Sequence, residues 1–150
     1  MCLSGADSGL ALVHSAAQGN EANLVDTTED FYTRHFDANV KGPIFLTKAV
    51  EPYLLKGGRI VFISSAGARL GVAGQTVYAA TKAADEALVR VWAKELGQSH
   101  GITVNCVNPG PIATGMHDRQ GLYPWFRPVT EQKYNADAFY HVIYRSMVPK

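Results

Sequence analysis

Residues 59–63 read RIVFI, a short run in which every position after the arginine is apolar. A sheet strand with one wet face alternates apolar and polar residues, whereas a strand buried on both faces reads as a continuous apolar run. Gly57 and Gly58 precede the run, and the polar, glycine-rich segment 64–75 follows it. The stretch therefore predicts a central strand of a parallel sheet.

Two further apolar runs lie on either side of this strand in the sequence. Residues 10–13 read LALV and residues 101–107 read GITVNCV, so each run predicts a buried strand. Segments with helical spacing separate the three runs, giving the order strand, helix, strand, helix, strand. Two right-handed crossovers between three parallel strands form half of a doubly wound α/β sheet. We expect that architecture here.

The first helical segment spans about residues 28–55 and contains a proline. A capping signal, DTTE at 26–29, precedes apolar residues that recur at helical spacing. Pro43 lies inside the segment, so we expect a kink or a lost backbone hydrogen bond near Asn39.

The second helical segment spans residues 77–96. Glu86 and Arg90 are expected to pair on its solvent side, since they are one turn apart. Its apolar face is expected to consist of Ala79, Ala80, Ala83, Ala84, Ala87, Leu88, Val91 and Trp92.

Composition narrows the class of protein. The chain has 150 residues, 47% of them hydrophobic, and a net charge of +1 with no basic run. We therefore expect one globular domain over residues 1–150 and neither nucleic acid nor a membrane as partner. Cys2 and Cys106 are too few for a disulfide framework or a zinc site, which favours no metal and a cytoplasmic location. Residues 1–9 lack periodicity and are expected to be a disordered or non-native start.

Tyr78 and Lys82 are one turn apart on the second predicted helix. A nearby ammonium favours the phenolate, which would lower the pKa of Tyr78 and make it a usable proton donor or acceptor. Such a pair also occurs by chance at ordinary surfaces. Ser65 follows the 59–63 strand at its carboxyl end, where ligands bind in open α/β sheets. Its hydroxyl would then bind a substrate carbonyl or, alternatively, cap the loop backbone.

Four short segments together resemble the short-chain dehydrogenase/reductase family. The similarity spans about residues 10–116. The overall sequence is also similar to fungal polyketide and naphthol ketone reductases and to acyl-carrier-protein ketoreductases. It implies a Rossmann-like fold of which this chain holds strands 4, 5 and 6. The segments are Asn39-Val40-Lys41-Gly42, Ile63-Ser64-Ser65-Ala66-Gly67, Tyr78-Ala79-Ala80-Thr81-Lys82, and Asn108-Pro109-Gly110 with Thr114.

The resemblance implies a catalytic role for four residues. Tyr78 would be the general acid/base, and Lys82 would bind the nicotinamide ribose and lower the pKa of Tyr78. Ser65 would orient and polarise the carbonyl. Asn39 would hold a water in the proton relay to Lys82, although its residue type alone suggests an exposed polar helix position.

The resemblance also implies a cofactor and a substrate class. NADP is the expected cofactor, with NAD possible, and hydride would pass to a ketone or from an alcohol. Pro109, Gly110, Ile112 and Thr114 would line the nicotinamide, and the family form would be a homo-oligomer. The aromatic stretch 116–128, with Tyr123, Trp125 and Phe126, would form the substrate pocket or cover the core.

The sequence departs from the family pattern at three places. HSAA at 14–17 stands where the family has Asn-Asn-Ala-Gly, residues 1–9 supply no strand with a glycine-rich phosphate turn, and residues 146–150 end early. We therefore expect the catalytic half of an enzyme of roughly 250 residues. The alternative is a catalytically incompetent fragment that acts as a dimerisation or interaction module.

Overall fold

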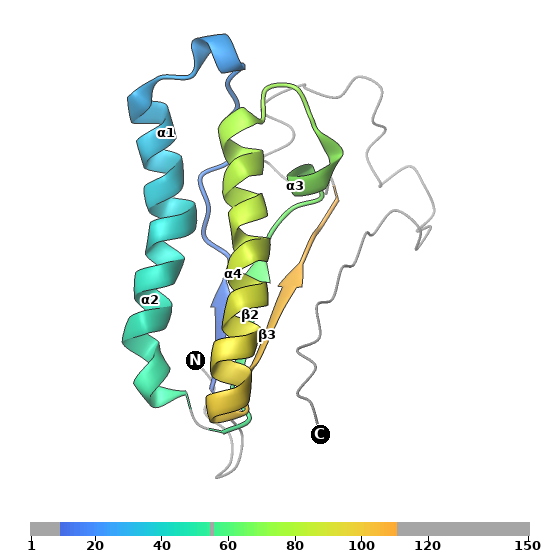
Figure 1. Ribbon diagram of the computed structural model, residues 1–150. Helices are drawn as coiled ribbons and strands as arrows, with labels where there is room; N and C mark the ends of the chain where they lie inside the picture. Colours follow the sequence, from blue (N-terminus) through green and yellow to red (C-terminus); the bar gives the residue numbers. More distant parts are fainter. Residues whose placement is uncertain (1–9, 55, 111–150) are drawn as a thin grey trace.

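A computed structural model describes residues 10–54 and 56–110 of the chain (Figure 1). Within these residues, three parallel strands form one sheet in the order β1-β2-β3, comprising β1 (Ala11–His14), β2 (Arg59–Ile63) and β3 (Thr103–Val107). The RIVFI strand occupies the centre, as predicted. Its burial is less even than expected, because Ile60 and Phe62 are buried whereas Val61 and Ile63 are half-buried. The expected partial Rossmann-like α/β sheet is confirmed.

The connection from β1 to β2 is one interrupted helix. It consists of the α-helix α1 (Glu29–Phe36), the π-helix η2 (Asp37–Lys41) and the α-helix α2 (Gly42–Val50). Short 3-10 turns stand before and after these pieces, η1 (Leu24–Asp26) and η3 (Glu51–Tyr53). The long helix expected over 28–55 is therefore divided, with its irregular turn where the sequence predicts it.

The π turn has a local cause in the sequence. Pro43 has no backbone N–H, so it cannot donate to the Asn39 carbonyl four residues earlier, as an α-helix requires. The preceding Gly42 N–H instead bonds to the carbonyl of Asp37, five residues back. One wide turn thereby accommodates the proline without ending the helix.

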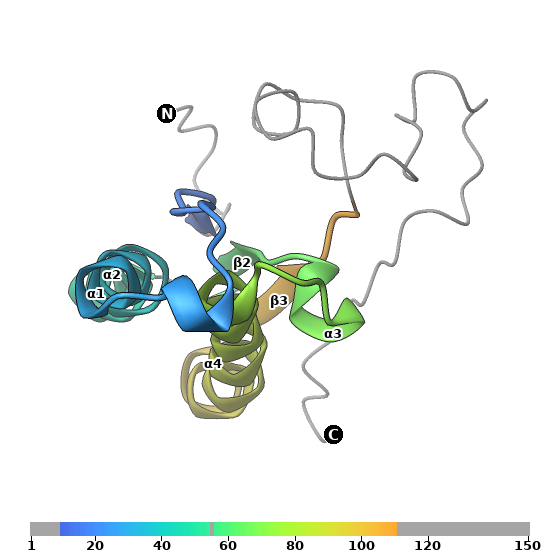
Figure 2. The same ribbon diagram turned by 90° about the horizontal axis from the view of Figure 1, so that it is seen from above.

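The connection from β2 to β3 contains α3 (Gly67–Leu70) and the long helix α4 (Thr76–His100). Gly101 ends α4 at a φ of 63°, a left-handed conformation that glycine adopts without a Cβ clash. Figure 2 shows α1, α2 and α4 on the same face of the sheet. None of the helices in the described ranges combines the length and apolarity that a membrane crossing requires.

The apolar core lies between the sheet and α4. Ile60 and Val104 from the strands, together with Val89 of α4, are fully buried there. The Phe62 ring packs 5.5 Å, centroid to centroid, from the Trp92 ring. This packing fixes α4 against β2 and β3, and thereby sets where the first turns of α4 lie relative to the carboxyl ends of the strands.

The buried face of α4 agrees only in part with the one expected. Leu88 and Trp92 pack against the core, as expected. Ala80, Ala83, Ala87 and Val91 are exposed among the described residues, so the alanine-rich stripe is not the core face. Alanine is too small to distinguish a core stripe from a surface stripe by periodicity alone. The residues of α4 that are buried include several polar ones: Val77, Thr81, Lys82, Asp85, Glu86, Val89 and Gly97.

Candidate active site

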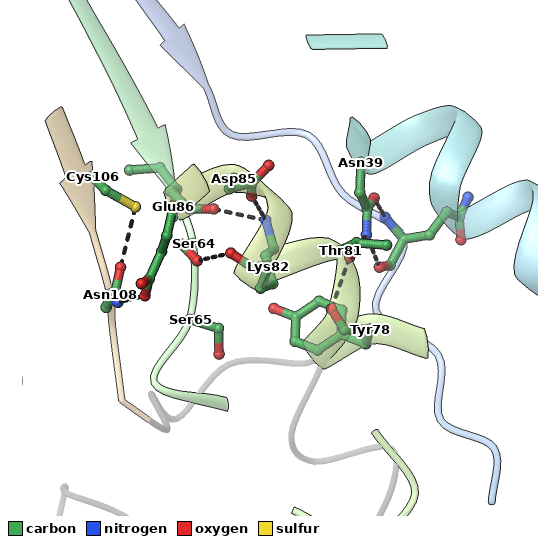
Figure 3. A network of polar contacts seen from close by, with 12 residues as sticks. Asn39, Ser64, Ser65, Tyr78, Thr81, Lys82, Asp85, Glu86, Cys106 and Asn108 are labelled. Carbon is green, nitrogen blue, oxygen red and sulfur yellow. Dashed lines mark hydrogen bonds and ion pairs between the residues drawn. The ribbon is translucent and has the colours of Figure 1, made fainter. Parts of the chain in front are cut away.

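Tyr78 and Lys82 project from successive turns near the beginning of α4, at the carboxyl edge of the sheet (Figure 3). The Lys82 Nζ lies 5.9 Å from the centroid of the Tyr78 ring. The helical spacing therefore brings the ammonium and the phenol into the proximity that the sequence predicts. Tyr78 is half-buried and Lys82 is buried, so the pair is partly shielded from water.

The Lys82 ammonium is held by two acceptors within the described residues. Its Nζ donates to the carbonyl of Ile63, the last residue of β2, at 2.8 Å and to Asp85 Oδ2 at 3.1 Å. Asp85 lies one turn further along α4 and is only 2% exposed. The sheet and the helix together fix the position of the charge.

Two serines follow β2 and have different surroundings. The Ser64 hydroxyl donates to the Lys82 carbonyl at 2.9 Å, so this side chain joins the end of β2 to α4. The Ser65 Oγ accepts a hydrogen bond of 3.1 Å from the Gly67 N–H, which leaves its hydroxyl proton to be donated elsewhere. Figure 3 shows the Tyr78 hydroxyl turned toward the segment that carries Ser65.

Asn39 is buried in the π turn and not exposed, contrary to what its residue type alone suggests. Its Nδ2 donates to the Gln18 carbonyl and to Thr81 Oγ1, both at 2.9 Å. Its Oδ1 accepts from the Gln18 N–H at 2.7 Å. The side-chain amide therefore connects the loop after β1, the π turn and the α4 turn that follows Tyr78.

A second polar cluster lies beside this group and was missed from the sequence. Arg69 of α3 binds Glu86 through Nε at 3.0 and 3.2 Å and through Nη2 at 2.8 Å. The Asn108 side-chain amide also donates to Glu86. Burial by itself raises the pKa of Glu86, but the hydrogen bonds from Arg69 and Asn108, together with the charges of Arg69 and Arg90, outweigh it and lower the pKa.

The ion pair expected between Glu86 and Arg90 is present, but Glu86 is buried and not on the solvent side. Glu86 is 6% exposed and faces α3 and the loop after β3, while Arg90 Nη1 approaches it only to 3.9 Å. A one-turn spacing on the same helix favours local pairing. Arg69 binds Glu86 more closely than Arg90 does, because its guanidinium contacts the carboxylate with two nitrogens.

Asn108 also brings Cys106 into this cluster. The Cys106 thiol donates to Asn108 Oδ1 over 3.2 Å. Burial raises the pKa of the thiol to about 11. At neutral pH this cysteine is therefore a protonated, buried donor.

His14 replaces the first asparagine of the family pattern at the end of β1. Its Nε2 lies 2.8 Å from Thr47 Oγ1, so the imidazole joins β1 to α2. Within the described ranges, no three His, Cys, Asp or Glu residues are grouped so that they could bind a metal ion. At the position of the family's asparagine, His14 therefore has a structural hydrogen-bond partner, Thr47.

The loop after β3 begins within the described residues and continues beyond them. Pro109 and Gly110 are half-buried, and the Pro109 carbonyl accepts from the Ala66 N–H at 2.9 Å. This bond joins the expected cofactor loop to the segment that carries Ser65. Ile112, Thr114 and the expected pocket at 116–128 lie outside the described residues.

Known proteins resemble this chain in sequence and in structure. A sequence profile described as Enoyl-(Acyl carrier protein) reductase matches residues 10–138. The short-chain dehydrogenase/reductase FrzI from Cladobotryum sp is 46% identical over 103 residues, covering 69% of this chain and 40% of FrzI.

Two solved structures are similar in fold as well as in sequence. A short-chain dehydrogenase from Burkholderia cenocepacia J2315 in complex with NADP has a TM-score of 0.68 at 35% identity, covering 86% of this chain and 48% of that chain. The landomycin C-6 ketoreductase LanV with bound NADP and rabelomycin has a TM-score of 0.67 at 30% identity, covering 70% of this chain and 42% of that chain.

The chain belongs to the short-chain dehydrogenase/reductase family. The resemblance inferred from four short motifs, including the likeness to fungal reductases, is confirmed. The chain spans 40% of the length of FrzI and 48% of the Burkholderia dehydrogenase.

Proposed function

We propose that this chain carries the catalytic residues of an NAD(P)(H)-dependent oxidoreductase that interconverts a ketone and an alcohol. Tyr78 is the general acid/base, Lys82 binds the ribose of the cofactor, and Ser65 orients the substrate oxygen. The observation that carries the proposal is the placement of the Lys82 Nζ 5.9 Å from the centroid of the Tyr78 ring, at the carboxyl edge of the sheet. Ligands of open α/β sheets bind at that edge.

The two solved relatives support the choice of cofactor and substrate. The Burkholderia dehydrogenase was crystallised with NADP, and LanV is a ketoreductase with bound NADP. We therefore take NADP as the preferred cofactor, with NAD as the second choice. The substrate is proposed to be a small-molecule ketone in the reductive direction.

The described residues fit the ribose and nicotinamide end of such a cofactor. An ammonium has three N–H donors, and the contacts with Ile63 and Asp85 use two of those on Lys82. A third donor is thus available to a ribose hydroxyl. Pro109 and Gly110 are half-buried beside the Ser65 segment, where they can contact a flat ring without adding a polar side chain.

The reaction divides between the cofactor and the protein. The bound nicotinamide supplies hydride chemistry. Tyr78 donates its phenolic proton to the substrate oxygen in reduction and accepts a proton in oxidation. The positive charge of Lys82 lies beside the Tyr78 ring from which the proton leaves.

Ser65 and Asn39 orient the reacting groups. The Ser65 hydroxyl proton is available to the substrate carbonyl because Gly67 already donates to its oxygen. Asn39 fixes the Thr81 turn between Tyr78 and Lys82, so its side chain acts through the backbone of α4. We further propose that Asn39, in the π turn, holds a water molecule that takes part in a proton relay to Lys82.

A kinetic comparison tests the proposed role of Tyr78. NADPH oxidation by the chain is measured with a panel of aromatic ketones, and NADH is measured in parallel. Replacing Tyr78 by Phe retains the ring but removes the proton, so we expect a loss of roughly 10²–10⁴-fold in rate. Tyr53→Phe is the matched control, because Tyr53 is 72% exposed on η3 and should leave the rate unchanged.

Two results would count against the proposal. Equal rates for the wild-type chain and Tyr78→Phe would remove Tyr78 from the chemistry. Calorimetric titration that detects no binding of NADPH or NADP⁺ would favour an interaction module without catalytic activity.

A further inference from the structure

Asp85 is a buried acid for which the proposed reaction has no role. It is 2% exposed and Lys82 is 4% exposed, so their ion pair lies in the interior. Removing two charges from water is costly, and an apolar pair of similar size is often as stable. A pair of this kind beside a catalytic phenol therefore suggests a function other than stability.

The two oxygens of Asp85 have unequal surroundings. Oδ2 accepts from Lys82 Nζ at 3.1 Å, whereas Oδ1 is buried with no hydrogen-bond partner among the described residues. A carboxylate offers only acceptors, so an unpartnered buried oxygen penalises the charged form. Burial consequently raises the pKa of Asp85 to about 6, and the opposing effect of Lys82 only partly offsets it.

In the described part of the chain, Lys82 is the cation that forms an ion pair with Asp85. On α4, Lys82 contacts Asp85, while Glu86 is engaged by Arg69 of α3. On β3, the buried Cys106 thiol lies within electrostatic range of Asp85. On β1, the imidazole of His14 bonds to Thr47 of α2, and burial lowers its pKa.

Lys82 is held between Asp85 and the end of β2. The Ile63 carbonyl is a neutral acceptor, so Asp85 supplies the negative charge in this arrangement. A carboxylate in contact with an ammonium reduces the net positive field that reaches a neighbouring phenol. The protonation state of Asp85 therefore changes both how firmly Lys82 is held and how much of its charge acts on Tyr78.

We propose that Asp85 is a positioning residue for Lys82, whose carboxylate holds the ammonium against the carboxyl end of β2 and whose protonation in weakly acid solution releases it toward Tyr78 and the ribose. The effect on catalysis rests on the proposed function, whereas the coupling between Asp85 and Lys82 does not. No oxidant, reductant or metal is involved, since one proton moves between solvent and the Asp85 carboxyl.

Nuclear magnetic resonance of the 150-residue chain without cofactor tests this coupling. The carboxyl carbon resonance of Asp85 should titrate with a midpoint at about pH 6. The Lys82 ammonium resonances should shift with the same midpoint, because their acceptor loses its charge. In Asp85→Asn the Lys82 transition should disappear, and in Asp85→Glu it should persist with a changed midpoint.

Asp30→Asn is the matched control for the change of an aspartate to its amide. Asp30 pairs with Arg34 on α1, and both side chains are exposed, at 76% and 65%. This variant should retain the Lys82 transition of the wild-type chain. A Lys82 signal that does not respond between about pH 4 and 8, in a wild-type chain whose Asp85 titrates, overturns the proposal.

The same variants separate a positioning role from a merely structural one. If the chain turns over ketones, Asp85→Asn should remove one ionisation from the pH profile of kcat/KM without abolishing kcat. An unchanged profile in a folded variant also overturns the proposal. If the chain turns over no ketone, that result counts against the proposed function, and the resonance titration still tests the coupling between Asp85 and Lys82. If Asp85→Asn fails to fold, the wild-type titration decides.

Discussion

His14 Nε2 lies 2.8 Å from Thr47 Oγ1, and this hydrogen bond joins the end of β1 to the middle of α2. The buried imidazole also packs against Phe62, with 4.5 Å between the ring centroids. Burial lowers the pKa of His14 from 6.5, so the folded chain holds the neutral form. The first crossover is therefore attached to the sheet through a group whose uncharged form is favoured by burial.

Replacing His14 by Gln should remove a pH-dependent component of stability. Because the pKa is lowered on folding, the unfolded chain takes up the proton first, and stability falls as the pH drops below 6.5. The free energy of unfolding of the wild-type chain, relative to His14→Gln, should fall by at most about 1.4 kcal/mol per pH unit there. Urea unfolding at several pH values measures it. His100→Gln, at an exposed histidine, is the control, and parallel wild-type and His14→Gln curves would contradict the assignment.

Replacing Glu86 by Gln should loosen the contact between α3, α4 and the loop after β3. The neutral amide loses the charge-assisted bonds from Arg69, and we expect a destabilisation of about 1–3 kcal/mol. Since the pKa of Glu86 is lowered on folding, its contribution to the free energy of unfolding is present above pH 4.5 and is lost as the pH falls through the folded pKa. Denaturant unfolding at neutral and acid pH tests both effects. Glu95→Gln, an exposed glutamate of the same helix, should be nearly neutral.

Asn39→Leu should destabilise the chain, because it removes three hydrogen bonds made by the Asn39 side chain. The substitution removes the side-chain partners of the Gln18 N–H and carbonyl, and each lost hydrogen bond costs about 0.5–1.5 kcal/mol. Asn39→Asp retains an acceptor for the Gln18 N–H but loses both donors. We therefore expect the order wild type, Asp, Leu in decreasing free energy of unfolding, and an Asn39→Leu chain as stable as the wild type would refute the bridging role.

Cys106 should react slowly with iodoacetamide in the folded chain. Its thiol is 1% exposed, and burial raises its pKa to about 11, so little thiolate is present at neutral pH. Peptide mass spectrometry of Cys106 with and without denaturant measures the difference. Labelling of the folded chain at the denatured rate would show that the thiol is accessible.

The three strands could be predicted because they are short continuous apolar runs bounded by glycine or polar residues. Residues 59–63 have no alternating pattern to suggest another pairing, and the structure places them at the centre. The irregular turn near Asn39 could also be predicted, since the missing N–H of Pro43 is a property of one residue type. In both cases the cause is local in the sequence.

The polar cluster around Glu86 could not be predicted because its cause is not local. Arg69 reaches α4 from α3, and Asn108 reaches it from the loop after β3. A charged residue among alanines usually indicates a solvent-exposed position, whereas Glu86 is buried. The available signal was the position of Lys82, Asp85 and Glu86 on one side of the helix.

The π turn determines the spacing of the buried residues along the whole first crossover. His35, Asn39, Pro43 and Thr47 are buried at intervals of four residues, whereas a regular α-helix repeats every 3.6 residues. Each four-residue step overshoots a full turn by about 40°, and the wider π turn recovers much of the accumulated rotation. Deleting one residue between Asp37 and Lys41 would rotate everything after it by about 100° and turn Thr47 away from His14. A one-residue deletion in this crossover should therefore cost the fold more than a substitution at one of its exposed positions.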